Sequence, residues 1–490
     1  MDSRRFINLI FYSKLKANKI INSFNLLSMK IFTERSFLII YLLLALTCSV
    51  EASYSANSND SINLPKKVSL NDKIIGLSKV WSEIKYNFIN IDQVDFDIDS
   101  LYFKTIPKII NTSNDIEYYD ELQRFMAAFN DGHTELIKRS YNWNDYFDYI
   151  PGGIVEINHK MYFSSYRKNS TMDSTLLGAE IIKIEDVPVK DYLNQFIFPS
   201  ISSSTESFRW TEASVKLQQG LKGSFLNGVA RKLDGKLVQF SIPRNGESTR
   251  TPQDEYIGPK RKKEYEGDIN LIWNKKIAVL TINSFYSNQI IGKIDSLATI
   301  VNSRADGLII DLRNNRGGSS VVAKHLQKYV LGKDTILTFG AQKRINDGYF
   351  RSQGNYRDEY KAFFQGKAIE TIQPQKFQVE STLHPFNCKI IILIGKYSFS
   401  ACEDFLVNIY EAPNRPLLIG EPTGGSTGAP LMIPLPNNAM ARVCTVRILY
   451  PYSKKPFINK GVQPDIEIKQ NIKDYLKDND VVLERAFNEF

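Results

Sequence analysis

The feature that most constrains this chain is a series of short, almost wholly apolar segments between residues 269 and 470. Segments 307–312 and 389–394 each contain one charged residue among aliphatic ones, which is typical of strands buried on both faces. Such runs alternate with segments of helical spacing, and the alternation predicts an α/β core over 269–470 with a mostly parallel sheet. The other strand-like runs are 277–282 and 417–419, and the helical segments are 290–301, 321–330 and 401–410.

A serine lies where the predicted strand 389–394 turns into the following helix. Functional sites in parallel sheets gather beyond the carboxyl ends of the strands, and Ser400 occupies such a position. There a hydroxyl could act as a nucleophile while the N–H of Ala401 faces the developing oxyanion. The same position suits an ordinary N-cap serine, and Ser398 and Cys402 are neighbouring alternatives.

Paired glycines, Gly317 and Gly318, follow the buried strand 307–312. Glycines let the backbone approach a ligand closely and expose N–H groups. The pair could therefore supply a second oxyanion donor, although a plain tight turn explains it equally well.

The chain has four histidines, at positions 133, 159, 325 and 384. His133 follows Asp131-Gly132 at the end of an apolar helical segment, where a loop could present it to another part of the protein. The residues alone do not select one of the four. Neither metal-ligand spacing nor a phosphate or dinucleotide loop occurs, so no metal and no cofactor is expected.

The regions before the core differ in their patterns. Residues 53–70 are polar and are interpreted as a linker, and 71–140 show the apolar spacing of helices, which predicts a helical N-terminal domain. Residues 147–200 carry short alternating runs broken by Gly and Pro. Residues 201–268 are polar and stay an unassigned connection. Residues 471–490 are expected to form a helical tail.

Within 147–200, the segment 178–189 resembles the strand pair of a PDZ domain. A peptide binds such a domain by adding to a sheet edge, with its carboxylate against backbone N–H groups. Gly152 and Gly153 stand in only loosely for the carboxylate loop, and they are the candidate substrate-binding residues. A peptide-binding module and a degenerate, purely structural one both remain open.

The N-terminus is expected to be an export signal. Residues 37–47 form an apolar run of 11, too short for about 30 Å of hydrocarbon but suited to a signal peptide with cleavage after Ala52. Residues 1–52 are thus interpreted as an export signal with an upstream leader, and the protein as periplasmic or cell-envelope. An uncleaved anchor, lipidation at Cys48 and a start at Met29 stay open, and only the first two would tie the protein to a membrane.

Composition excludes several classes of protein. The hydrophobic share of 43% excludes a disordered chain, and four cysteines exclude a disulfide scaffold. The net charge of +9 is too dilute for nucleic-acid binding, and the one dense basic cluster, Lys260–Lys263, is interpreted as a solvated loop. No oligomeric state is indicated.

Taken together, five stretches resemble the tail-specific, or C-terminal processing, serine peptidase family. The resemblance implies a helical N-terminal part, a PDZ-like β-rich insert and a crotonase-like α/β core. It also implies Ser400 as nucleophile and the N–H groups of Gly318 and Ala401 as oxyanion donors. The stretches are Phe129–Thr134, Asp306–Gly318, Ser398–Glu403, Gly420–Ser426 and Gly461–Asp465.

Two departures from the family pattern concern the general base. One branch of the family uses a lysine, which is absent from the matching stretch Thr423–Ser426. The tricorn-like branch uses a histidine, and His133 matches it. That branch also orients the histidine with a glutamate, for which this chain has Ile458 followed by Asn459. Asn459 is therefore the candidate for orienting the ring, as Asn does in Cys-His-Asn enzymes.

The resemblance thus implies an exported serine endopeptidase that hydrolyses peptide bonds of unfolded or C-terminally exposed polypeptides. The alternative is a catalytically weak or inactive binding protein on the same fold, a carrier of a ligand or peptide. An α/β-hydrolase esterase is disfavoured because no Gly-x-Ser-x-Gly surrounds Ser400.

Overall fold

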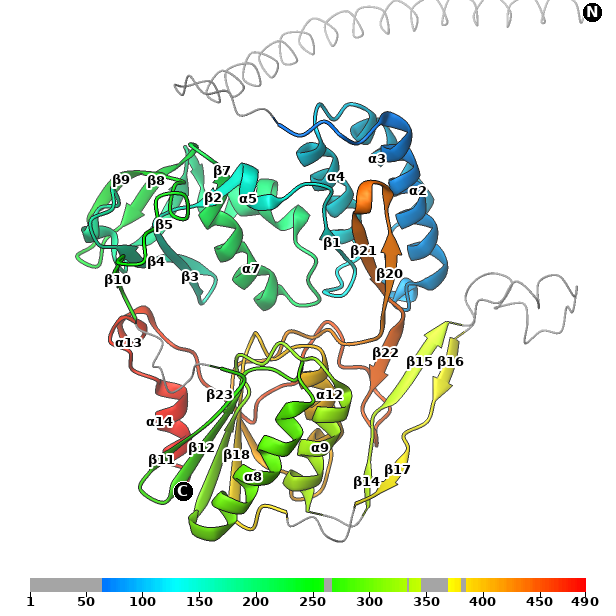
Figure 1. Ribbon diagram of the computed structural model, residues 1–490, viewed down its shortest axis with the longest axis vertical. Coiled ribbons are helices and arrows are strands. Elements are labelled where there is room, and N and C mark those ends of the chain that lie inside the picture. Colours follow the sequence, from blue (N-terminus) through cyan, green and yellow to red (C-terminus); the bar gives the residue numbers. More distant parts are fainter. Residues whose placement is uncertain (1–63, 260–266, 333–334, 345–368, 380–384) are drawn as a thin grey trace, which may run out of the picture. The chain divides into compact units, whose positions relative to one another are not determined.

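The computed structural model describes residues 64–259, 267–332, 335–344, 369–379 and 385–490 (Figure 1). The expected export signal, with Cys48 and Ala52, lies outside the described residues, as do Lys260–Lys263 and His384. Across the described ranges, no helix combines the length and apolar character needed to cross a membrane.

The first described region consists of three helices, α2 (Leu70–Asn87), α3 (Ile98–Ile110) and α4 (Asp115–Ala127). Each begins where a polar side chain accepts a hydrogen bond from a backbone N–H of the first turn, which satisfies donors that the helix leaves unpaired. The capping residues are Ser69, Asp97 and Asn114.

Strands from far along the chain complete this helical region. β1 (Glu135–Lys138) pairs with β21 (Met440–Cys444), which pairs with β20 (Pro430–Pro434). Val443 and Ala441 share an apolar core with Leu77 and Leu122 of the helices. The structure therefore differs from a helical domain that ends at 140, because residues predicted within the 269–470 core are part of it.

Next comes a seven-stranded antiparallel sheet with the order β10-β4-β5-β8-β9 and with β3 and β6 on its side branches. It packs against α7 (Glu206–Gln218) through Trp210 and Leu217. The strands are β3 (Gly152–Ile157), β4 (Lys160–Arg167), β5 (Glu180–Ile184), β6 (Val187–Pro188), β8 (Phe225–Arg231), β9 (Leu237–Pro243) and β10 (Tyr256–Ile257).

Strands β8, β9 and β10, from the region unassigned from sequence, thus belong to the same sheet as β3, β4, β5 and β6. Strands β8 and β9 pair along their whole length around the turn at Gly235. Each buries only two residues, since most of their side chains lie on the open face. Because so few of their residues are buried, the spacing of apolar residues in the sequence did not predict these strands. The likeness of this region to a PDZ domain stays a prediction.

The α/β core has the predicted, mostly parallel sheet, with strand order β11-β12-β13-β18-β19-β23 (Figure 1). Only the β11–β12 pair is antiparallel. The multidomain α/β fold class is therefore confirmed. The strands are β11 (Ile269–Asn274), β12 (Ile277–Ile282), β13 (Gly307–Asp311), β18 (Lys389–Ile394), β19 (Leu417–Gly420) and β23 (Ile466–Glu467).

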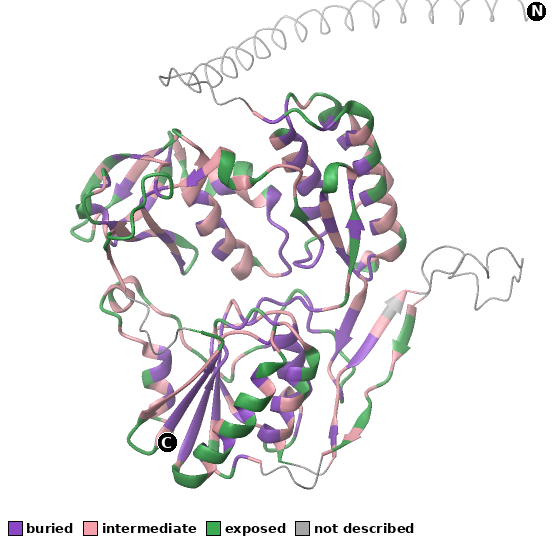
Figure 2. Ribbon diagram, in the orientation of Figure 1, coloured by how far each residue is buried: buried purple, intermediate pink, exposed green. Residues whose placement is uncertain are grey.

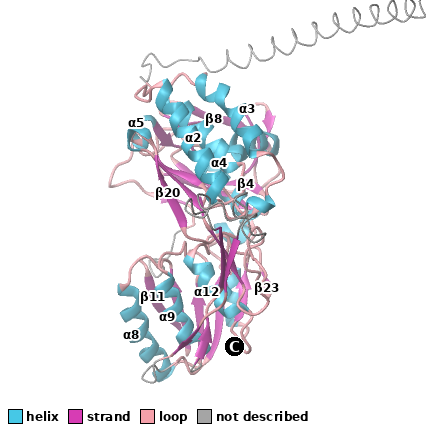
Figure 3. Cartoon of the chain, turned by 90° about the vertical axis from the view of Figure 1, so that its right-hand side faces the viewer, coloured by secondary structure: helices cyan, strands magenta, loops and turns pink. Residues whose placement is uncertain are grey.

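Successive residues of these strands face opposite helical layers. Leu308 and Ile310 share a core with α8 (Gln289–Arg304), α9 (Ser320–Leu331) and α12 (Ala401–Tyr410), whereas Ile309 packs with α14 (Val481–Phe487). Figure 2 shows these strands as buried, and Figure 3 shows α8 and α9 lying beside them. Burial on both faces explains why the strands are continuously apolar.

Short elements complete the described chain, and the two last helices fit the expected helical tail. β2 pairs with β7, β14 with β17, and β15 lies between β16 and β22. Their bounds are α5 (Trp143–Tyr146), β2 (Phe147–Tyr149), α6 (Val189–Tyr192), β7 (Gln219–Leu221), β14 (Thr335–Leu337), β15 (Gly340–Arg344), β16 (Ile369–Ile372), β17 (Lys376–Gln378), β22 (Val446–Leu449) and α13 (Ile472–Leu476).

A buried lysine ties the antiparallel sheet to the core. Lys396, just after β18, lies 2.5 Å from Glu156 of β3 and 3.3 Å from Glu421 after β19. The side chain of Glu156 is 1% exposed and that of Lys396 is 13% exposed. Two buried charges of opposite sign therefore depend on one another across the two regions.

We expect Lys396→Met to lower the free energy of unfolding by about 3 kcal/mol, because it leaves the Glu156 carboxylate buried without its partner. Thermal unfolding followed by circular dichroism checks this. The matched control is Lys276→Met, whose pair with Asp306 is exposed on both sides and should melt close to the wild type. Equal melting temperatures for the two variants would contradict the account.

Candidate active site

Ser400 lies at the junction of β18 and α12 in a strained backbone conformation. Its φ of 57° and ψ of −127° belong to a region that residues with a side chain rarely adopt and that costs roughly 1–3 kcal/mol. It precedes the first turn of α12, yet its hydroxyl caps no backbone N–H. The hydroxyl instead lies 3.1 Å from Nε2 of His133. The N-cap interpretation is therefore wrong for the side chain of this serine.

The two neighbouring alternatives are occupied in other ways. The Ser398 hydroxyl is fully buried and donates to the carbonyl of Leu312 at 2.8 Å. Cys402 is fully buried inside α12, and burial raises the pKa of its thiol well above the usual value. Neither side chain lines the pocket beside Ser400.

His133 comes from the loop between α4 and β1, and its ring is held on several sides. Its backbone N–H donates to Asp131 Oδ1 at 2.8 Å. The ring stacks on Phe399, with centroids 4.9 Å apart and planes 6° apart. Nδ1 lies 2.7 Å from the hydroxyl of Ser426. These contacts fix the ring so that Nε2 faces Ser400, and the residue is 2% exposed.

The other described histidines do not approach Ser400. His159 lies in the β3–β4 turn and stacks on Trp210, with centroids 5.1 Å apart. His325 lies on α9, where its Nε2 is 2.6 Å from Asp295. Of the described histidines, the geometry therefore brings only His133 to the serine.

Ser426 is the residue that the sequence analysis missed. Its own backbone N–H donates to Glu403 Oε2 at 2.9 Å, and the N–H of Gly425 donates to Oε1 at 2.6 Å. The Thr423 hydroxyl donates to the same carboxyl group. Glu403, in the first turn of α12, thus shapes the loop that presents Ser426 to His133. The sequence signal for this residue is the polar stretch Thr423–Ser426, which matches the segment that carries the lysine in one branch of the family.

The proposal that Asn459 orients the histidine is wrong. Its side-chain amide donates to Gln93 Oε1 at 2.8 Å, next to the short helix 91–93. The residue has a φ of 65°, which turns the chain sharply between Ile458 and Gly461. Only its backbone N–H approaches the site loop, at 3.4 Å from the carbonyl of Gly425.

The backbone around Gly317 and Gly318 reaches the serine directly. Gly317 has a φ of 90°, and a Cβ placed on it would lie 2.7 Å from the Ala401 nitrogen. The backbone N–H of Phe285 donates to the carbonyl of Gly317, and the N–H of Ser319 donates to the carbonyl of Phe285. The N–H of Gly318 takes part in neither of these two hydrogen bonds. Hydrogen bonding within α12 begins with the N–H of Cys402, one residue after Ala401. Gly317 therefore lies against Ser400 and Ala401, and neither Gly318 nor Ala401 is among the residues that line the pocket.

Gly152 and Gly153 do not form a carboxylate-binding loop. They are the first residues of β3 and pair with Tyr166 and Ser165 of β4. The N–H of Gly152 already donates to the carbonyl of Ile150 at 2.8 Å. Both glycines thus lie in a strand rather than in a loop, and neither lines the pocket beside Ser400, so the structure gives no support to their assignment as substrate-binding residues.

Burial sets the charge state of the site. It lowers the pKa of His133 to about 3, and the positive charge of Arg442 acts in the same direction. It raises the pKa of Glu403 to about 7, against the hydrogen bonds from Thr423 and the loop N–H groups. The imidazole is therefore neutral at physiological pH and has a free lone pair on one nitrogen.

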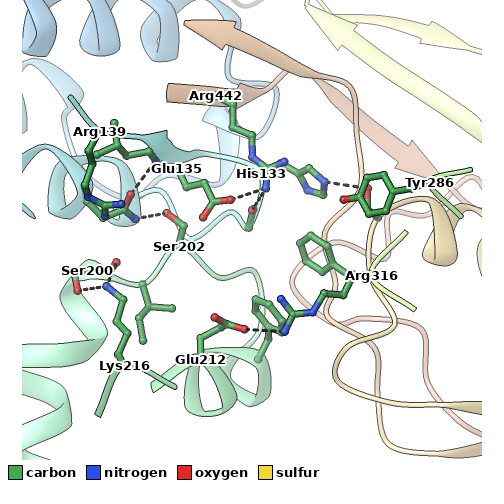
Figure 4. Close-up of a pocket in the computed structure, with 17 residues that line it drawn as sticks. His133, Glu135, Arg139, Ser200, Ser202, Glu212, Lys216, Tyr286, Arg316 and Arg442 are labelled. Carbon is green, nitrogen blue, oxygen red and sulfur yellow. Dashed lines mark hydrogen bonds and ion pairs between the residues drawn. The ribbon is translucent and has the colours of Figure 1, made fainter. Parts of the chain in front are cut away.

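A pocket of about 380 Å³ opens beside Ser400 and His133 (Figure 4). Phe399 and Phe208 contribute apolar surface, and Tyr286, which is 77% exposed, also lines the pocket. Charged side chains of both signs line the rest (Figure 4). In the described part of the chain, no group of three or more His, Cys, Asp or Glu side chains is placed to hold a metal ion.

Comparison with known proteins indicates the class of protein to which the chain is similar. Residues 276–468 match the sequence model of Peptidase family S41, a range that includes Gly318, Ser400 and Ala401. The structure of mature CPAF is 14% identical with a TM-score of 0.63, and covers 84% of this chain and 95% of that chain. The structure of mature CPAF complexed with lactacystin is 13% identical with a TM-score of 0.62, and the match covers 86% of this chain and 97% of that chain. No curated protein matches the sequence.

A third solved structure, the photosystem II D1 C-terminal processing protease, is 13% identical with a TM-score of 0.44, over 81% of this chain and 93% of that chain. The likeness to CPAF shows a shared fold, and the family match covers the core that carries the serine. Together they define a serine-type peptidase. Residues 276–468 are thus similar to peptidase family S41, which supports the resemblance to tail-specific and C-terminal processing peptidases.

We expect Ser400→Gly to be more stable than Ser400→Ala by about 1 kcal/mol, because glycine adopts a φ of 57° without strain. Both variants lose the hydroxyl, so the comparison isolates the backbone. Thermal unfolding of the two proteins measures the difference. A glycine variant that melts below the alanine variant would show that the serine backbone is unstrained.

The buried neutral imidazole predicts a pH dependence of stability. Below pH 6.5 the unfolded chain binds a proton at His133 that the folded chain refuses until about pH 3. The contribution to stability is thus complete above pH 6.5 and is lost as the pH falls. The wild type should lose at most about 1.4 kcal/mol per pH unit relative to His133→Gln between pH 6.5 and 4.5. Denaturant unfolding checks this, and a constant difference would contradict it.

Proposed function

We propose that this chain is an exported serine endopeptidase in which Ser400 is the nucleophile and His133 the general base. The observation that carries the proposal is the 3.1 Å approach of His133 Nε2 to Ser400 Oγ, across 267 residues of sequence. A hydroxyl and an imidazole at this separation match the geometry required for proton transfer from a nucleophile to its base.

In the proposed reaction, Ser400 Oγ attacks the carbonyl carbon of the scissile bond while its proton passes to His133 Nε2. The tetrahedral intermediate then breaks its C–N bond, and His133 returns the proton to the leaving amine. A water molecule, deprotonated by the same nitrogen, hydrolyses the acyl-serine and releases the second product. No cofactor enters any of these steps.

The negative charge that develops on the carbonyl oxygen needs donors in place before the reaction. The N–H groups of Gly318 and Ala401 are our candidates, because Gly318 follows Gly317, which lies against Ser400, and Ala401 lies at the positive end of α12. The glycine conformations at 317 and 318, with φ of 90° and 141°, allow the backbone to come this close.

The third member of the proposed site is Ser426 rather than a carboxylate. For Nε2 to accept the serine proton, the single proton of the neutral ring must be on Nδ1, which then donates to Ser426 Oγ at 2.7 Å. The hydroxyl thus fixes the tautomer but supplies no charge to the imidazolium. We therefore expect slower turnover than in an enzyme whose histidine faces a carboxylate.

The substrate is proposed to be an unfolded or C-terminally exposed polypeptide outside the cytoplasm. The export signal expected at residues 1–52 supports the location, and the serine-type peptidase class supports a polypeptide substrate. A role of the antiparallel sheet in peptide recognition remains part of this proposal.

A fluorophosphonate probe, which reacts with activated serines, tests the catalytic assignment. The wild type should be labelled at residue 400, and Ser400→Ala should not be labelled at all. His133→Ala should lower the labelling rate at least about 100-fold, the contribution of a general base. Ser426→Ala should fall between the wild type and His133→Ala, because the ring remains but its tautomer is no longer fixed.

Ser398→Ala is the matched control, since this hydroxyl lies in the same turn but hydrogen-bonds to the backbone of Gly395 and Leu312 and does not line the pocket. It should be labelled like the wild type once its folding is confirmed by circular dichroism. A folded wild type that resists the probe would favour the alternative, a binding protein on a peptidase fold.

A further inference from the structure

The pocket beside Ser400 contains more positive than negative side chains. Two of its four cations have an acidic partner within the pocket: Arg442 lies 2.5 Å from Glu135, and Arg316 lies 3.9 Å from Glu212. The other two, Arg139 and Lys216, form no ion pair with any carboxylate of the described residues. The pocket thus holds an excess of two positive charges.

Lys216 is fixed in place by neutral groups. Its ammonium donates to the hydroxyl of Ser200 at 2.8 Å and to the carbonyl of the same residue at 3.2 Å. An ammonium group has three N–H donors, so one remains for a ligand. The nearby acid Asp120 is already paired with Arg124, 2.7 Å away.

The position of Lys216 is electrostatically unfavourable without a ligand. Burial lowers the pKa of Lys216 to about 8; the negative charges of Asp120 and Glu212 act against this shift, and the positive charge of Arg139 acts with it. A carboxylate bound at the Lys216 ammonium would offset the cost of burying its charge and supply an acceptor for its remaining N–H.

The two cations lie at the end of the pocket away from the candidate catalytic pair. Figure 4 shows Arg139, Lys216 and Ser200 on one side of the pocket and His133 and Tyr286 on the other. The apolar side chains of Leu136, Ile201 and Phe208 belong to the same lining. A substrate whose scissile carbonyl lies at Ser400 could therefore extend another group across apolar surface toward Lys216.

We propose that Lys216 and Arg139 form a subsite that binds a carboxylate of the polypeptide substrate. This inference rests on the proposed function for the identity of the ligand, and it makes the enzyme selective for substrates that carry negative charge near the cleaved bond. The carboxylate can come from an acidic side chain or from the C-terminus of the substrate, which present the same chemistry.

Binding to the Ser400→Ala variant tests the subsite without requiring catalysis. The probes are acetylated hexa-alanine amides with one Glu at each position in turn, each paired with a Gln twin. A further pair compares hexa-alanine with a free and an amidated C-terminus. Isothermal titration calorimetry measures the dissociation constants. We expect at least one charged probe to bind about tenfold more tightly than its neutral twin, the effect of one charge-assisted hydrogen bond.

The preference should disappear when Lys216→Met or Arg139→Gln is added to Ser400→Ala. Lys236→Met in the same background is the matched control, because Lys236 is an exposed residue of the β8–β9 turn. It should keep the full preference. The second pocket variant keeps the test informative if the buried Lys216→Met protein does not fold.

The outcomes separate the two sources and the two proposals. A Glu-over-Gln preference that Lys216→Met removes assigns the subsite to an acidic side chain. A preference confined to the free C-terminus assigns it to the terminal carboxylate. The proposed subsite is overturned if every charged probe binds no more tightly than its neutral counterpart or does not bind. It is also overturned if the preference for the charged probe persists in both the Lys216→Met and the Arg139→Gln variants. Failure of the catalytic proposal would appear instead as an unlabelled wild-type serine.

Discussion

The site depends on one contact, between the hydroxyl of Ser400 and Nε2 of His133. The serine comes from the turn after a central strand of the α/β core, and the histidine from a loop that follows the N-terminal helices. Neither region can supply the pair alone. The strands β20 and β21, which leave the core and complete the helical region, tie the two together. The pairing of these later strands with β1 therefore holds the two regions together and positions the site.

A second dependence runs through Glu403 to Ser426. The carboxyl group of Glu403 collects backbone N–H groups from the loop 423–426, and this loop offers a hydroxyl to the buried ring. A hydroxyl holds the ring as well as a carboxylate does, but it adds no negative charge. Burial thus dominates the pKa of His133 and keeps the ring neutral. The low pKa keeps the imidazole of His133 unprotonated and able to accept a proton, but it also makes the imidazole a weak base.

Sequence reasoning succeeded where local pattern determines structure. The strands β13 and β18 and the helix α12 follow directly from apolar periodicity. The places of Ser400 and Gly318 after those strands made them candidates, and their roles stay a proposal. It failed for Ser426 and Asn459, because which side chain reaches the ring depends on loop hydrogen bonds between residues far apart in sequence. It also failed for β8 and β9, each of which buries only two residues.

The central claim is that Ser400, His133 and two backbone N–H groups form one reaction centre. The most direct measurement is a crystal structure of the wild type after reaction with a fluorophosphonate. The account predicts phosphorus bonded to Ser400 Oγ, with a phosphoryl oxygen about 2.7–3.1 Å from the nitrogens of both Gly318 and Ala401. An adduct on another residue, or a phosphoryl oxygen directed away from these two nitrogens, would contradict it.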